Sequence, residues 1–95
     1  MITSKQRAHL RSLANNEQSL YQLGKAGIGE QFINQIDTAL EARELIKITV
    51  QKNSPVFARE AAQEIAEKCG AEIVSVVGSK IVLYRPSAEK PKIVL

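Results

Sequence analysis

Hydrophobic and polar residues follow a helical period most clearly over residues 30–43. Apolar positions recur there at spacings of three and four, so they form one stripe along a helix. The stripe consists of Phe32, Ile33, Ile36 and Leu40. The acidic residues off this stripe, which we expect to be solvated, are Asp37, Glu41 and Glu44. The pattern predicts an amphipathic helix over residues 30–43 that packs on the core by one side.

Capping residues predict a helix on either side of this one. Thr3 followed by Gln6 has the form of a capping box and favours a helix over residues 4–14. Ser54 followed by Pro55 is typical of a helix start, and Gly70 of a helix end. The apolar side of the first helix is formed by Leu10, Leu13 and Ala14, and that of the third by Phe57, Ala58, Ala61, Ala62, Ile65 and Cys69.

Four segments carry the signals of β-strands. Residues 45–50 alternate apolar and polar positions from Ile46 onward, and residues 20–23 form a short strand-like run. Residues 73–77 and 80–85 are rich in β-formers, and Gly78-Ser79 between them suits a two-residue hairpin turn.

The predicted order is helix, strand, helix, strand, helix, strand, strand, which indicates an α/β domain with a mixed four-stranded sheet and three helices. Two strand-helix-strand units demand right-handed crossovers and parallel neighbours, whereas the closing hairpin is antiparallel. One domain is expected over residues 1–85. Residues 86–95 hold two prolines and two lysines, and we expect a loose tail there.

Composition narrows the class of protein. The 95 residues, 44% hydrophobic and 24% charged, are typical of one globular domain. One cysteine excludes an intrachain disulfide, and with one histidine it excludes a zinc finger built from this chain alone. No apolar run approaches the roughly 18 residues of a membrane span, and the N-terminus lacks the apolar region of a secretory signal. We therefore expect a cytoplasmic protein with no membrane partner, cofactor or metal.

Candidate catalytic groups are few. His9 lies between Arg7 and Arg11 on the predicted first helix, and no pattern pairs it with Cys69 or with an activated serine. Cys69 is most simply a small buried residue at a helix end. We predict that the protein is not an enzyme. A small enzyme using His9 or Cys69 is the alternative, which substitution of either residue would test.

The aromatic residues predict no platform for stacking on bases. Phe32 and Phe57 belong to core stripes by their spacing. Tyr21 and Tyr84 lie in predicted strands, where half-buried packing is expected. An aromatic sheet surface of the RRM type is therefore not indicated.

Charge is distributed unevenly along a chain of net charge +3. Residues 1–28 carry four basic residues against Glu17, whereas residues 29–44 carry four acidic residues against Arg43. Two interpretations of the basic first helix stay open: a phosphate-binding face, or a solvated surface. The four basic residues are Lys5, Arg7, Arg11 and Lys25.

A glycine motif, Gly24-Lys25-Ala26-Gly27, follows the first predicted strand and precedes the central helix. Glycines lack a Cβ and let phosphates approach the backbone, and free amides at a helix start attract anions. The same G-x-x-G spacing clamps the nucleic-acid backbone in KH domains, and it differs from the P-loop and dinucleotide-binding motifs. The motif therefore predicts a backbone-binding loop, and a tight turn without a ligand is the alternative.

Four stretches, in the same order and spacing, resemble the CRM-domain family in its bacterial stand-alone form, the YhbY-like RNA-binding proteins. They span nearly the whole chain, to about Arg85. The stretches are TSKQR with LRSLA at residues 3–14, GKAGI at 24–28, ALEARELIKI at 39–48 and VGSKIVLYR at 77–85. The departures are Gly29, where relatives commonly carry a small polar residue, and residues 51–68, which hold no signature.

The resemblance implies a fold similar to the C-terminal domain of translation initiation factor three. It also implies an RNA partner, for bacterial members the large-subunit ribosomal RNA in pre-ribosomal particles. The family's proposed RNA contact maps onto Gly24, Lys25, Ala26 and Gly27. A second contact, the basic first helix, maps onto Lys5, Arg7 and Arg11.

We therefore predict a non-enzymatic RNA-binding protein that acts in assembly of the large ribosomal subunit. Lys47, Lys80 and Arg85 are either rim contacts or exposed strand charges that keep sheet edges soluble. Ribosomal proteins are further possible partners. The alternative function is a protein-interaction module that docks a ribosomal or assembly protein through its acidic second helix.

Overall fold

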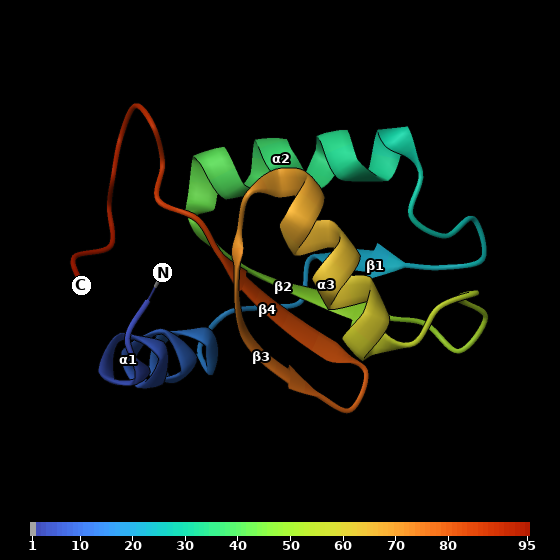
Figure 1. Ribbon diagram of the computed structural model, residues 1–95, viewed down its shortest axis with the longest axis horizontal. Helices are drawn as coiled ribbons and strands as arrows, with labels where there is room; N and C mark the ends of the chain where they lie inside the picture. Colours follow the sequence, from blue (N-terminus) through green and yellow to red (C-terminus); the bar gives the residue numbers. More distant parts are fainter. Residues whose placement is uncertain (1) are drawn as a thin grey trace.

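A computed structural model describes residues 2–95 and has the predicted order of three helices and four strands (Figure 1). The helices are α1 (Ser4–Ala14), α2 (Glu30–Arg43) and α3 (Ala58–Cys69), and the strands are β1 (Tyr21–Leu23), β2 (Leu45–Val50), β3 (Glu72–Val77) and β4 (Lys80–Tyr84). The α/β fold class is confirmed, and α1, α2 and β2 have the predicted bounds. No helix in the described part of the chain has the length and apolar character of a membrane span.

The strands form one mixed sheet in the order β1-β2-β4-β3. β1 and β2 are parallel neighbours joined through α2, as predicted. β2 and β3 also run in the same direction, as predicted, but they are not neighbours, because β4 lies between them and pairs antiparallel with both. The physical reason is burial: four consecutive residues, Ile81 to Tyr84, are buried, so β4 needs a central position with both faces covered.

The helices cover the two faces of the sheet unequally. α2 and α3 pack on one face over the larger core, which contains Leu23, Ile36, Leu40, Ile48 and Ile65. α1 packs on the other face over a smaller core. That second core consists of Leu10, Ala14, Leu45, Val74, Val82 and Tyr84. Each large side chain buried in this way stabilises the fold by about 1.5–3 kcal/mol.

The start of α3 differs from the prediction. The helix begins at Ala58, four residues after Ser54, because the Ser54 hydroxyl bonds the backbone N–H and carbonyl of Val56 at 3.2 and 2.9 Å. This local turn competes with helix formation. Phe57 therefore occupies the N-cap without a side-chain cap, and it is 79% exposed instead of belonging to the core. The helix ends at the predicted place, with Gly70 in the left-handed conformation.

The junction of α2 and β2 holds a buried carboxylate. Glu44, which the sequence pattern placed in solvent, is completely buried, and its backbone has a φ of 66°. Its carboxylate accepts N–H bonds from Ser87 at 2.7 Å, Lys92 at 2.6 Å and Ile93 at 2.8 Å. A left-handed φ is unfavourable for a residue with a Cβ, so these contacts hold the junction in place.

Glu41, one turn earlier, adds a second carboxylate to this contact. It accepts hydrogen bonds from the Ser87 hydroxyl at 2.5 Å and from the Ala88 N–H at 3.2 Å. Burial raises the pKa of Glu44, but its three N–H donors outweigh this, so the pKa lies below its ordinary value. The Ser87 hydroxyl and the Ala88 N–H lower the pKa of Glu41 as well.

Residues 86–95 contain no helix or strand, yet the two carboxylates hold their backbone. Ser87 is buried, and Ile93 packs against the core under α1. The sequence predicts a loose tail here, and its mobility stays a prediction. The hydrogen bonds themselves have no sequence signal.

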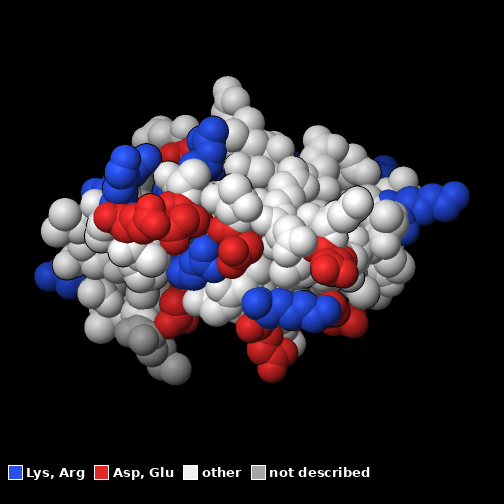
Figure 2. All heavy atoms as spheres, turned by 90° about the horizontal axis from the view of Figure 1, so that it is seen from above, with Lys and Arg blue, Asp and Glu red and all other residues white. Residues whose placement is uncertain are grey.

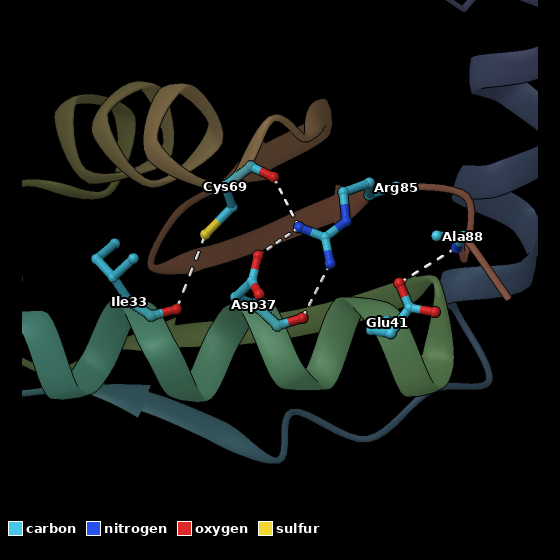
Figure 3. Close-up of polar contacts among 6 residues, drawn as sticks. All are labelled: Ile33, Asp37, Glu41, Cys69, Arg85 and Ala88. Carbon is cyan, nitrogen blue, oxygen red and sulfur yellow. Dashed lines mark hydrogen bonds and ion pairs between the residues drawn. The ribbon is translucent and has the colours of Figure 1, made fainter.

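The outer face of α2 carries a mixed charge pattern. Figure 2 shows acidic side chains gathered over one half of this face, with lysine and arginine side chains among them. The Asp37 carboxylate and carbonyl accept hydrogen bonds from the Arg85 guanidinium at 2.6 and 3.0 Å (Figure 3). The Asp37 side chain is exposed, as predicted, but it also forms an ion pair with Arg85.

Arg85, the residue after β4, forms hydrogen bonds with both α2 and α3. Besides Asp37 on α2, its guanidinium donates to the Cys69 carbonyl at the end of α3, at 2.8 Å (Figure 3). Its side chain is only 19% exposed, so Arg85 is neither a free rim contact nor an exposed strand charge. Cys69 is buried as predicted, and burial raises the pKa of its thiol, which lies 3.9 Å from the Ile33 carbonyl.

The Glu44 contact predicts how stability depends on pH. Folded-state pKa values below the ordinary value of 4.5 stabilise the protein above pH 4.5, and this stabilisation is lost as the pH falls through the folded pKa. Glu44→Gln replaces one acceptor oxygen with a donor that faces N–H groups. We expect the variant to lose about 2 kcal/mol of unfolding free energy at pH 7 and to depend less on pH below 4.5. Urea denaturation from pH 3 to pH 7 measures both.

Glu64→Gln is the matched control, because Glu64 makes an exposed ion pair with Lys68 within one helix. We expect its unfolding free energy to change by less than about 0.5 kcal/mol. Equal losses for Glu44→Gln and Glu64→Gln would contradict the role given to the buried carboxylate.

Candidate nucleic-acid interface

The glycine motif forms a tight turn between β1 and α2. The Gly27 N–H donates to the Gly24 carbonyl at 3.0 Å, which places Lys25 and Ala26 at the exposed tip of a β-turn. Gly27 has a φ of 73°, in the left-handed region that residues with a Cβ avoid. The turn therefore requires glycine at position 27 and presents Lys25 to solvent.

This glycine turn packs against the loop after β2, residues 51–57. A Cβ on Gly27 would lie 3.0 Å from Pro55 Cγ, and a Cβ on Gly24 would lie 2.7 Å from Gln51 Oε1. The Gln51 side chain donates to Gln22 at 2.5 Å, and its backbone N–H donates to the Leu23 carbonyl at 2.8 Å. The two loops thus form one unit at the carboxyl ends of the parallel strands β1 and β2.

A hollow of about 660 Å³ lies beside the turn and the start of α2. Gly29 is the N-cap of α2 and supplies no side-chain hydrogen bond, so the first amides of the helix are uncapped. Lys25 and Glu30 are the two charged residues of its lining. The amide side chains of the lining, which can donate and accept hydrogen bonds, are Gln22, Gln31, Gln35 and Gln51. These side chains offer hydrogen-bond donors and acceptors to a polar ligand.

The basic residues of α1 lie elsewhere. α1 and the glycine turn occupy opposite ends of the longest dimension of the molecule, which extends 35 Å (Figure 1). Lys5 and Arg11 are exposed, whereas Arg7 is half-buried, with an Nε that has no hydrogen-bond partner among the described residues. The structure therefore does not bring the two predicted groups of contact residues together.

Two lysines link these distant groups. Lys47 on β2 and Lys80 on β4 line a groove of about 260 Å³ together with Arg11 of α1. The Lys80 ammonium donates to the Thr49 hydroxyl at 2.7 Å. Alternation along β2 places Lys47 and Thr49 on the face opposite Ile46 and Ile48, which is the sequence signal for this groove.

A row of residues at one register connects the groove with the hollow. Gln22, which lines the hollow, pairs with Thr49, and Thr49 pairs with Lys80, which lines the groove. Paired residues share a face of the sheet. The polar surface therefore continues across the sheet from the glycine turn to α1.

The structure argues against both alternative sites, the acidic second helix and a catalytic pair of His9 and Cys69. Asp37 and Glu41 on α2, with Glu44 after it, already bind groups of the same chain, so a docking partner would compete with these contacts. His9 on α1 and Cys69 on α3 belong to elements on opposite faces of the sheet. The structure does not bring them together as a catalytic pair.

Residues 2–85 match the model of the CRS1 / YhbY (CRM) domain family. The chain is 39% identical over 95 residues to a Bacillus subtilis protein named probable RNA-binding protein YqeI, covering 100% of this chain and 99% of that one. It is 37% identical to probable RNA-binding protein MJ0652 of Methanocaldococcus jannaschii, covering 96% and 74%. A Haemophilus influenzae protein named RNA-binding protein is 32% identical, covering 93% and 89%.

The fold has a match among solved structures as well. The solution structure of the hypothetical protein SAV1595 from Staphylococcus aureus superposes with a TM-score of 0.82. The two sequences are 47% identical, and the match covers 100% of this chain and 99% of that one. The arrangement of three helices on a four-stranded mixed sheet is therefore shared with an experimental structure.

The geometry of the glycine turn predicts unequal costs for its two glycines. Gly27→Ala would combine a left-handed φ, worth about 1–2 kcal/mol, with crowding by Pro55. In Gly24→Ala only the flexible Gln51 side chain has to move, so we expect a loss well below 1 kcal/mol. Urea denaturation of the two variants measures the difference.

Gly70→Ala separates the two causes, because Gly70 has a φ of 63° and open space around its Cβ position. We expect Gly27→Ala to destabilise the protein more than Gly70→Ala does. Equal losses for these two variants would show that contact with Pro55 plays no part.

Proposed function

The chain belongs to the CRS1 / YhbY (CRM) domain family, and we propose that it binds RNA through the glycine turn of residues 24–27. The names of its relatives as RNA-binding proteins support this proposal. The observation that carries it is the turn itself, with Lys25 at its tip beside the glutamine-lined hollow of about 660 Å³. Loops of the same G-x-x-G spacing clamp the nucleic-acid backbone in KH domains.

Each part of the site has a role in holding an RNA backbone. The Lys25 ammonium and the uncapped amides at the start of α2 attract a phosphate, and Gly27, packed against Pro55, holds the turn that presents Lys25. The glutamine amides of the hollow can bond sugar hydroxyls and base edges. Phosphate contacts of this kind give affinity and position, with little reading of sequence.

The RNA continues, in this proposal, across the sheet to α1. The row from Gln22 through Thr49 leads to Lys80, and Lys47 and Arg11 line the groove beyond it. Lys5 and Arg7 extend the basic surface on α1. This path joins the two groups of predicted contacts, which lie at opposite ends of the molecule.

We propose that the RNA is the large-subunit ribosomal RNA in precursor particles, so that the protein is a non-enzymatic assembly factor of the cytoplasm. The resemblance of the chain to bacterial stand-alone members of the family supports this target. Ribosomal proteins on the same particles would be its neighbours.

Lys25→Glu tests the backbone contact. We expect a large loss of affinity for single-stranded RNA in fluorescence anisotropy, because the tip of the turn would repel a phosphate. Each lost phosphate contact also makes the slope of log affinity against log salt less steep by about 0.7. Lys68→Glu is the control with the same charge change on the exposed, paired Lys68 of α3. Comparable losses in the two variants would contradict a specific role for the turn.

Sedimentation of a cell lysate through a sucrose gradient tests the target. We expect the tagged protein to migrate with precursors of the large subunit, and the Lys25→Glu variant, still folded, to stay at the top. If the native protein also stays at the top at low salt, the ribosomal target is wrong, even where binding to free RNA persists.

A further inference from the structure

Phe57 exposes an aromatic ring that the core could have buried. Its side chain is 79% exposed, whereas Tyr84 is buried and Tyr21 and Phe32 pack partly against the larger core. The exposure follows from the late start of α3, which leaves Phe57 at the N-cap instead of on the apolar stripe. Single exposed apolar residues are common, so the surroundings of the ring decide what it does.

The ring forms part of a groove of about 290 Å³ between the loop after β2 and the hairpin turn of β3 and β4. Val50, Val56 and Ala58 give the groove an apolar floor beside Phe57. Lys52, Ser54, Gly78 and Ser79 complete its rim. The Val50 N–H donates to the Ser79 carbonyl at 2.7 Å, which joins the two walls. The volume lies near the lower limit of about 300 Å³ for ligand pockets, so it suits a small planar group.

The groove adjoins the glycine turn. Gln51 lines both the groove and the hollow beside Lys25. Pro55, two residues before Phe57, is the residue against which Gly27 packs. An RNA strand held at the turn therefore passes the groove, and the positive charge of Lys52 at its rim favours the same strand.

We infer that Phe57 stacks on an unpaired base of an RNA whose backbone is held by the glycine turn. The inference rests on the proposed function and adds a ligand class to it, single-stranded RNA with an accessible base. The bases of a duplex are already stacked on their neighbours and cannot reach the ring. A stacking contact is tolerant of sequence, since every base has a flat aromatic face.

Two variants, compared with the native protein on three probes, test this contact. The probes are a single-stranded RNA of about ten nucleotides, the same RNA with abasic sites, and its duplex. We expect Phe57→Leu, which keeps an apolar side chain without a ring, to bind the single strand about 10-fold to 100-fold more weakly than the native protein. Its salt dependence should stay unchanged, because no phosphate contact is lost. Phe57→Tyr should keep the native affinity.

The abasic strand and the duplex test whether the lost affinity comes from an unpaired base. The native protein should bind the abasic strand about as weakly as Phe57→Leu binds the intact one, and Phe57→Leu should bind the duplex as the native protein does. Circular dichroism and urea denaturation check that the variants fold, which the exposure of the ring favours.

The failure of this inference differs from the failure of the proposed function. The stacking contact is wrong if Phe57→Leu binds the intact strand as tightly as the native protein does. It is also wrong if the native protein binds abasic and intact strands equally. In either case a loss of affinity in Lys25→Glu still supports the glycine turn. If the native protein binds no RNA even at low salt, both are wrong.

Discussion

The parallel pairing of β1 with β2 is the constraint on which the candidate site depends. Parallel strands end at the same edge of a sheet, so the loops after β1 and β2 must meet there. β4 runs antiparallel to β2 and begins at that edge, which brings the hairpin turn of residues 78–79 beside them. Ligands of open α/β sheets bind outside the carboxyl ends of strands for the same reason. The glycine turn, the Phe57 groove and the hairpin therefore share one end of the molecule.

Unequal coverage of the sheet leaves a second surface, which we propose as part of the RNA path. α2 and α3 bury one face over the larger core, whereas α1 reaches over the smaller core on the other. Lys47 and Lys80 project from that partly covered face beside Arg11. The charged residues that line this groove are thus all basic, while Asp37, Glu41 and Glu44 bind groups of the same chain. The fold thus separates the acidic contacts within the chain from the basic groove of Arg11, Lys47 and Lys80.

The features of the fold that could be predicted from the sequence are those set by residues close together in the chain. The capping box at Thr3, the apolar stripe of α2 and the alternation in β2 each depend on residues within one turn or one strand, and all three predictions are confirmed. Ser54-Pro55 is also a local signal, but the Ser54 hydroxyl forms a turn with Val56 that competes with the helix. The position of β4 and the burial of Glu44 depend on partners far along the chain, which no local pattern reports. The sequence pattern wrongly places Phe57 in the core, because its spacing matches α3, which begins only at Ala58.

Glu44 ties the middle of the chain to residues made much later. The N–H groups that satisfy its carboxylate belong to residues 43, 48 and 49 positions further along. An ionised carboxylate is costly to bury before its donors arrive. During synthesis, which proceeds from the N-terminus, a nascent chain that ends before residue 87 must therefore keep this carboxylate in water. The full set of donors to Glu44 therefore exists only in a chain that includes residues 87–93.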